Sequence, residues 1–353
     1  MKAATTSDQQ KVIDVHAHTH SAAAEAIVES EDGHAADRIR ARRHIGEASA
    51  RQNDNLMKGV WRHALVDPNA RLEAMDEFGI AHQLVSVSPL QYYYWADPDL
   101  ARRVVAVQNE SIARLCDLGK GRISGLGAVA LQHPELAVSQ LVEGVRDYGL
   151  KGVIASTSIC GRWLDQTVSE DFWECAERVG AVVFIHPPGF GWDDLLSDYY
   201  LSNLVGNPLE TTIVLLRMIF GGVFDRHSAL KLFAAHGGGF FPHYIGRFDH
   251  GFRNRPEVMT CKHLPSHYLN RIWYDCIVHD AQTLDNLIRR VGATRVVVGT
   301  DYPFDMGIQN PQELLDRLDL TAEEKSAVCG GNAVQLLSLG GMPQFASWST
   351  DNQ

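Results

Sequence analysis

Two histidines near the start of the sequence have a spacing that suits metal binding. In the segment IDVHAH, His16 and His18 stand two residues apart. Side chains of a β-strand alternate between its faces, so a strand here would point both imidazoles to one side, where they could bind a single ion. A purely structural role is the alternative, because strand histidines also serve as hydrogen-bonding core groups.

Three further polar residues follow apolar runs later in the chain. His186 follows VVFI, His236 follows LFAA, and Asp301 follows VVVGT. Histidine and aspartate together suit a borderline divalent ion, Zn²⁺ or alternatively Mn²⁺, and a position left open to water would make such a site catalytic. Asp301 could instead cap a helix or form a turn, and His236 could be a turn histidine before three glycines.

The elements that must position these residues alternate between strand and helix. Amphipathic helices are expected at residues 71–78, 98–118, 134–148, 169–179, 208–219 and 281–291, interleaved with short apolar or β-branched runs. Such alternation implies a parallel sheet, and eight repeats favour a closed (β/α)8 TIM barrel, whose active site lies at the carboxyl ends of the strands. The eight runs are residues 12–15, 83–87, 123–129, 152–155, 181–185, 230–234, 271–275 and 295–299.

Two long connections and a polar tail depart from an ideal barrel. Residues 19–61 contain no clear strand, and an insertion of this length after the first strand is expected to cover the active site. A second long connection spans residues 189–207, and residues 340–353 form a Gly/Ser-rich polar tail. We see no repeat and no linker-like shift in composition, so we expect one domain over residues 1–353.

Composition excludes several classes of function. The chain has 353 residues, of which 45% are hydrophobic and 21% charged, which is ordinary globular composition. A formal charge of −11 opposes binding to a nucleic-acid backbone. We also expect no membrane span and, because the six cysteines show no CxxC spacing, a cytoplasmic protein with reduced thiols.

Longer motifs resemble the decarboxylase branch of the metal-dependent amidohydrolase superfamily. The matching strings include IDVHAH, FIHPPG, NPLETTI, AAHGGGFFPHYIGR and VVVGTDYPF. Members of this branch act on carboxymuconate semialdehydes, γ-resorcylate and 5-carboxyvanillate. The resemblance implies that His236 lies beside a metal-bound water as a general base, and that Arg247 reaches the neighbouring site of a homodimer to hold a substrate carboxylate. It further implies one Zn²⁺ bound by His16, His18, His186 and Asp301.

The expected activity is therefore decarboxylation of a small anionic carboxylate. The substrate could be a carboxymuconate semialdehyde, which would take up hydroxide before losing CO2, or an ortho-hydroxy aromatic acid, whose ring would be protonated first. Pro188 replaces a tryptophan of the branch, and Arg62 is the nearest candidate for its N-terminal substrate-binding arginine. In the run YYYW, Tyr93 and Trp95 could stack on a ring, although such runs more often pack internally.

Two other functions remain open from the sequence. A metal-dependent hydrolase of an amide, ester or lactone could use the same activated water on a carbonyl. Lys151 begins the fourth apolar run rather than ending it, so it offers no bridge for a second metal, but a single metal fits both reactions. A binding protein that keeps a structural metal without turnover is the third alternative, because a fold does not determine a function.

Overall fold

Eight parallel strands of the described residues form a ring, as predicted for a barrel. The computed structural model describes residues 12–189 and 194–340. Backbone ladders join the strands into two sheets, ordered β1-β2-β3 and β10-β9-β8-β7-β4. Parallel bridges from Gly127 to Val153, and from Asp14 to Val298, link the two sheets at both edges and close the ring. The strands are β1 (Val12–Thr19), β2 (Ile80–Val87), β3 (Ile123–Gly125), β4 (Gly152–Ser156), β7 (Val182–His186), β8 (Lys231–Ala234), β9 (Ile272–Asp275) and β10 (Val296–Val297).

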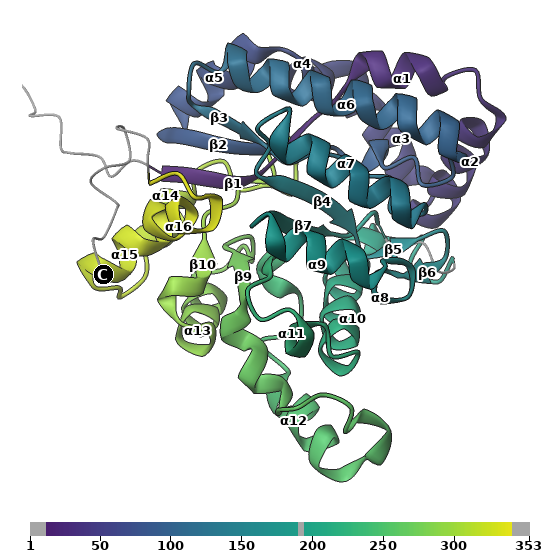
Figure 1. The fold of residues 1–353 in the computed structure, drawn as a ribbon. Coiled ribbons are helices and arrows are strands. Elements are labelled where there is room, and N and C mark those ends of the chain that lie inside the picture. The colour runs from purple at the N-terminus through teal and green to yellow at the C-terminus, as the bar shows by residue number, and fades with distance from the viewer. Residues whose placement is uncertain (1–11, 190–193, 341–353) are drawn as a thin grey trace, which may run out of the picture.

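The helices that follow the strands surround this ring (Figure 1). The longest expected helix, Pro98–Leu118, has the bounds that the sequence predicts. Its start is fixed because Asp97 accepts hydrogen bonds from the first turn and proline occupies the first helical position. The barrel helices are α5 (Pro68–Glu77), α6 (Pro98–Leu118), α7 (Pro134–Arg146), α8 (Leu164–Thr167), α9 (Glu170–Arg178), α10 (Asn207–Phe220), α11 (Val223–Arg226), α12 (Ile245–Asn254), α13 (Ala281–Val291), α14 (Pro311–Asp316), α15 (Ala322–Ser326) and α16 (Asn332–Leu337). A short antiparallel pair, β5 (Ser158–Ile159) and β6 (Arg162–Trp163), follows β4.

The insertion after β1 is helical. It contains α1 (Ala22–Val28), α2 (Asp32–Ile45), α3 (Glu47–Leu56), a π-helical turn (Met57–Trp61) and α4 (Arg62–Val66). Helix α2 buries none of its residues, which explains why no amphipathic pattern marked it in the sequence. At the end of the insertion Trp61 is 5% exposed and contacts the ring of Phe304 edge-on, at 5.0 Å between centroids. The insertion thus reaches the loop that follows β10.

Aromatic side chains fill the barrel interior beneath the strand ends. Phe184 on β7 and Phe233 on β8 are fully buried and stack with 4.4 Å between ring centroids. The ring of His16 lies edge-on to Phe184 at 4.8 Å. The floor below the histidines is therefore apolar and closely packed.

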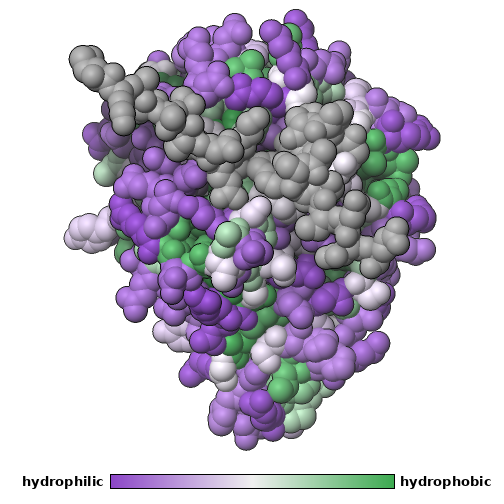
Figure 2. Space-filling model, turned by 90° about the vertical axis from the view of Figure 1, so that its left-hand side faces the viewer, coloured by the Kyte–Doolittle hydropathy of each residue, from purple (hydrophilic) through white to green (hydrophobic). Residues whose placement is uncertain are grey.

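Hydrophobic residues occur in small patches between hydrophilic ones on the face shown in Figure 2, outside its grey atoms. Such a mixed face is ordinary for a surface in contact with water. Among the described residues, no helix combines the length and the apolar composition that crossing a bilayer requires.

A buried histidine at the amino-terminal side of the barrel should make stability depend on pH. His82 on β2 is fully buried between the carbonyl of Gly121 and the hydroxyl of Ser124, and burial lowers its pKa to about 4. The unfolded chain takes up this proton near the ordinary value of 6.5, so the contribution is present above pH 6.5 and is lost as pH falls toward 4. The loss should reach about 3 kcal/mol.

Denaturant unfolding of the wild type and of His82→Gln at several pH values between 7 and 4 measures this effect. The wild type should lose its advantage over the variant as the pH falls, because glutamine does not titrate. Titrations elsewhere in the chain cancel in the difference. A difference in unfolding free energy that stays constant across the range would contradict the assignment.

Candidate metal centre

A β-bulge in β1 sets the direction of its two histidines. Asp14 pairs with Gln83 of β2 and Ala17 pairs with Val85, so β1 carries one extra residue between the two pairs. Bulges of this kind redirect side chains and are common beside active sites. The backbone N–H of His16, inside the bulge, donates to Asp14 Oδ1 at 3.0 Å. The simple alternation assumed from the sequence is therefore modified where the ligands lie.

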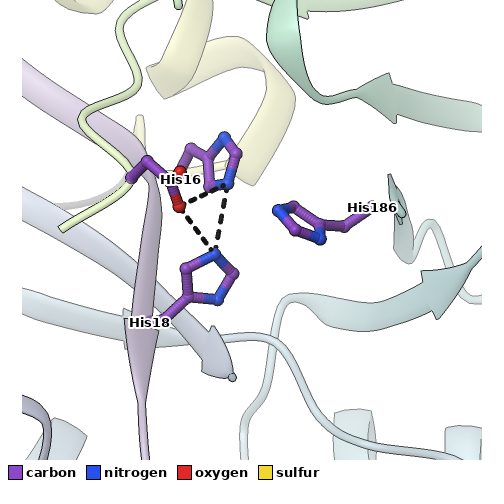
Figure 3. Close-up of side chains that lie close together, drawn as sticks. His16, His18 and His186 are labelled. Atoms are coloured by element: carbon purple, nitrogen blue, oxygen red, sulfur yellow. Dashed lines mark hydrogen bonds and ion pairs between the residues drawn. The ribbon is translucent and has the colours of Figure 1, made fainter. Parts of the chain in front are cut away.

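The structure brings together four of the predicted residues. Figure 3 shows the three histidines among them. One candidate ligand atom from each of His16, His18, His186 and Asp301 lies within 4.8 Å of the others. The Nε2 atoms of His16 and His18 are 3.3 Å apart, and Asp301 Oδ1 is 3.4 and 3.1 Å from them. The His186 ring faces the other two histidines from the opposite side (Figure 3). All four residues are at most 6% exposed.

Each of the three histidines uses its Nδ1 atom for a hydrogen bond away from the cluster. Nδ1 of His16 donates to Asp275 Oδ2 at 2.7 Å, that of His18 to the Val87 carbonyl at 3.3 Å, and that of His186 to the Pro187 carbonyl at 2.8 Å. These acceptors place the proton on Nδ1 in the neutral ring and leave the Nε2 lone pair directed inward. Metal-binding histidines commonly have such outer partners.

A divalent cation fits this arrangement. His186 Nε2 and Asp301 Oδ1 are buried and accept no hydrogen bond from the described residues. With the histidine protons on Nδ1, the lone pair of His18 Nε2 also faces a carboxylate oxygen at 3.1 Å. Electron-rich atoms packed so closely without a proton between them are unfavourable unless a cation lies among them. Three imidazoles and one carboxylate are a donor set that Zn²⁺ and Mn²⁺ both accept.

The electrostatics of three of the four groups favour the protonation state that a cation needs, and His16 is the exception. Burial, aided by the neighbouring histidines, holds the pKa of His186 well below its ordinary value, and burial also lowers the pKa of His18. Burial alone would raise the pKa of Asp301, but the adjacent histidines outweigh it and the net shift is downward. The pKa of His16 rises, because its bond to Asp275 and the charge of Asp301 overcome the effect of burial.

His236 lies beside the cluster in a turn that follows β8. Its ring centroid is 5.2 Å from that of His186, and its Nε2 is 4.0 Å from Asp301 Oδ2. Its φ of 55° is left-handed, which histidine tolerates better than most residues. Burial lowers its pKa, so the ring is neutral at neutral pH. A neutral imidazole near the open side of the cluster can accept a proton.

Asp275, at the end of β9, was not identified from the sequence as a site residue. One carboxylate oxygen accepts from both His16 Nδ1 and the backbone N–H of His236, and the other accepts from the N–H of Gly237 at 2.8 Å. Asp275 thus holds a candidate ligand and the adjacent histidine in one arrangement. The signal was available, because Asp275 is the last residue of the seventh run, just as His186 directly follows the fifth.

The predicted substrate-binding residues lie outside the cluster. Arg62, at the start of α4, pairs with Glu25 of α1 at 3.2 Å. Tyr93 and Trp95 have ring centroids 6.1 and 6.4 Å from that of His34 on α2, on the inserted segment. Arg247 lies exposed on α12, with no side-chain partner among the described residues.

Tyr92, which the sequence did not single out, lies directly beside the cluster. Its hydroxyl donates to the backbone carbonyl of His186 at 3.4 Å, and its ring stacks on Tyr94 at 5.6 Å. It is thus one aromatic ring of the YYYW run in hydrogen-bonding contact with a residue of the cluster.

The fold and this cluster together define a barrel protein with a divalent-metal centre at the carboxyl ends of its strands. The amidohydrolase family model matches residues 13–339, and the chain belongs to this family. 2-Amino-3-carboxymuconate-6-semialdehyde decarboxylase of Dictyostelium discoideum is 35% identical over 276 residues, 77% of each chain. Gamma-resorcylate decarboxylase of Polaromonas sp. is 26% identical over 298 residues, 79% of this chain and 90% of the relative.

A solved structure supports the same fold. That of 5-carboxyvanillate decarboxylase from Novosphingobium aromaticivorans, in complex with manganese and 4-hydroxy-3-methoxy-5-nitrobenzoic acid, has a TM-score of 0.79 at 22% identity. The match covers 94% of this chain and 96% of the other. The predicted resemblance and the predicted barrel are both confirmed.

Proposed function

We propose that this protein is a metal-dependent, non-oxidative decarboxylase of a small anionic carboxylate, such as a carboxymuconate semialdehyde or an ortho-hydroxy aromatic acid. The observation that carries the proposal is the pairing of a buried three-histidine, one-aspartate cluster with a neutral His236 beside it. The decarboxylase activities of the relatives point to this reaction rather than to the hydrolysis of an amide, ester or lactone.

The proposed ligands are His16, His18, His186 and Asp301, and we infer Zn²⁺ as the ion. Mn²⁺ is the alternative, and it is the metal in the similar 5-carboxyvanillate decarboxylase structure. A bound divalent ion would supply a Lewis acid that lowers the pKa of water and polarises a substrate oxygen. His236 would accept a proton from the attacking water at its ring nitrogen and would return it to the carbon that loses CO2, so that no net proton is released. Asp275 helps to fix the position of His236 by accepting a hydrogen bond from the backbone N–H of His236.

Recognition of the substrate requires cationic groups, because the substrate is an anion and the chain is acidic overall. Arg247 from the partner subunit is the proposed carboxylate clamp, and Arg62 is a second candidate whose charge Glu25 partly offsets. Tyr93 and Trp95 are proposed to stack on the substrate from the insertion. We further propose that the chain is one domain and that residues 19–61 cover the site, which the contact of Trp61 with Phe304 supports.

Metal analysis and product analysis together test the function. Purified protein should contain about one divalent ion per chain, and should release CO2 from a carboxymuconate semialdehyde or an ortho-hydroxybenzoate. Chelation should stop CO2 release, and adding the metal back should restore it. If the protein binds metal and hydrolyses an ester or lactone but releases no CO2 from any carboxylate, the assignment changes from decarboxylase to hydrolase. If the protein binds metal but converts none of these substrates, it is a binding protein with a structural metal.

The homodimer proposal rests on Arg247 and its surroundings. Tyr244 and Phe240 precede Arg247 and are 60% and 37% exposed, which suits an interface. Figure 1 shows α12 projecting from the barrel. Mixing His236→Ala with Arg247→Ala subunits should restore about a quarter of wild-type activity, because each mixed dimer contains one intact site.

One further mixture decides whether Arg247 acts across subunits. His236→Ala mixed with Asp301→Ala is the matched control, because both residues belong to the same chain's site and no mixed dimer can regain a complete one. If His236→Ala and Arg247→Ala chains form mixed dimers and activity does not return, Arg247 does not serve the neighbouring site.

A further inference from the structure

We propose that Arg71 is a positioning residue for the metal centre, and that a buried chain of side chains through Gln83, Asp14 and Thr300 fixes the spacing of the metal ligands. The proposal rests on the proposed function only in taking the cluster of His16, His18, His186 and Asp301 as a metal site. None of the four residues in the chain is itself a proposed ligand.

Arg71 is a fully buried cation that contacts the backbone of β1. It lies on α5, which packs on β2, and it is 1% exposed. One terminal nitrogen donates to the carbonyl of His18 at 2.5 Å, and the other donates to Gln83 Oε1 at 2.7 Å. The guanidinium also lies 5.1 Å from the ring centroid of Tyr302. Burial of a charge is costly, so a cation held here by a backbone carbonyl has a specific task.

Gln83 transmits this contact to a buried carboxylate. Its amide nitrogen donates to Asp14 Oδ2 at 2.8 Å, so the amide separates the cation of Arg71 from the anion of Asp14. Asp14 is fully buried and Gln83 is 1% exposed. Each polar end of the Gln83 amide is used, which fixes its orientation. Replacing either neighbour would leave a buried group without its partner.

Asp14 completes the chain at both ligand-bearing segments. Its Oδ1 accepts from the backbone N–H groups of His16 and Thr300, each at 3.0 Å. Its Oδ2 accepts from the Thr300 hydroxyl at 2.6 Å. One carboxylate therefore holds the bulge of β1 next to the residue that precedes Asp301.

The chain acts where the barrel closes. His16 and His18 lie on β1, Asp301 lies just after β10, and the two segments meet through hydrogen bonds from Asp301 N to His16 O at 2.7 Å and from His18 N to Tyr302 O at 2.8 Å. Three candidate ligands thus depend on one seam between the first and last strands. Arg71 holds the outer side of the His18 peptide, and Asp14 holds the His16 peptide. Movement along this seam would change the distances among the ligand atoms.

The test compares the metal affinity of Arg71→Met with that of Arg122→Met. Arg122 is the matched control, since its guanidinium likewise donates to backbone carbonyls of a barrel strand. Its acceptors are Ile80 and Ala81, at the start of β2 and away from the metal ligands. Chelator competition should show metal affinity about 10–100-fold weaker in Arg71→Met, with little change in Arg122→Met. The absorption spectrum of the Co²⁺-loaded protein should also change in Arg71→Met alone, because it reports ligand geometry.

A double-mutant cycle tests whether the chain acts as a unit. Arg71→Met and Thr300→Val should each weaken metal binding, and their combination should weaken it by less than the product of the two effects. Arg71→Lys should recover part of the affinity, because lysine can keep one of the two contacts. If Arg71→Met does not fold, Gln83→Met and Thr300→Val carry the same comparison.

The outcomes separate this inference from the proposed function. Wild-type protein that binds no divalent ion would overturn the metal centre itself. Wild-type protein that binds metal, together with an Arg71→Met variant of unchanged affinity and unchanged Co²⁺ spectrum, would overturn only the positioning role. If the losses of metal affinity in Arg71→Met and Thr300→Val simply multiply in the double variant, the four buried side chains do not act as a unit.

Discussion

Asp301→Asn should abolish both metal binding and CO2 release. Asparagine fits the left-handed backbone at this position, where φ is 58°, but it removes the anion of the ligand set. Loss of an outer partner of a metal ligand already costs about 10–100-fold in affinity, so loss of a ligand should cost more than about 100-fold. Metal content by elemental analysis and CO2 release by the same preparation measure the two effects.

Thermal unfolding gives a second measure of the same substitution. Bound metal stabilises the folded chain by an amount that rises with the logarithm of the ratio of free metal to its Kd, so a chelator should lower the melting temperature of the wild type. The chelator should have little effect on Asp301→Asn. Asp305→Asn is the matched control, because it makes the same change of charge on an exposed residue of the same loop. An Asp301→Asn protein that keeps its metal at wild-type affinity would remove Asp301 from the ligand set.

The fold was accessible from the sequence because its signal is local and repeated. Each strand is a short apolar run, and closure of the ring follows from the repetition of strand and helix. The last barrel strand is the shortest, with only Val296–Val297 in regular pairing, although the predicted run spans residues 295–299. Helix α2 left no pattern because it buries no residue. Local periodicity therefore predicts the barrel and misses the helices of the insertion.

The cluster was accessible for a similar reason, whereas its supporting groups were not. His16, His18, His186 and Asp301 each stand at a recognisable place in a run. Their partners are distant in the sequence: Asp275 is 259 positions from His16. Arg71 and Gln83 look like ordinary residues of a helix and a strand, and nothing local pairs them with Asp14. Long-range hydrogen bonds of this kind leave no periodic signal.

The aromatic run shows how irregular backbone limits sequence reasoning. After β2 the chain makes a 3-10 turn at Pro89–Gln91, and Tyr93 has a φ of 44°. Neither a strand nor a helix period applies to such a segment. Tyr92 therefore contacts His186, while Tyr93 and Trp95 face α2 of the insertion.

His236→Asn should reduce turnover strongly and leave metal binding intact. Asparagine tolerates the left-handed backbone at this position and keeps the N–H that donates to Asp275. It cannot accept and hold a proton as imidazole does, so kcat should fall by about 10²–10⁴-fold. His279→Asn is the matched control, because His279 is an exposed histidine with a similar φ of 59°. Metal content should equal that of the wild type in both variants.

The pH profile distinguishes a proton acceptor from a residue that only shapes the site. Burial lowers the pKa of His236, so the ring is the active neutral base at neutral pH and is lost as a base when pH falls through that lowered pKa. The kcat/KM of the wild type should therefore decline on the acid side at a lower pH than an ordinary histidine would give. This acid limb should be absent from the residual activity of His236→Asn and present in His279→Asn. An unchanged limb in His236→Asn would assign the proton transfer to another group.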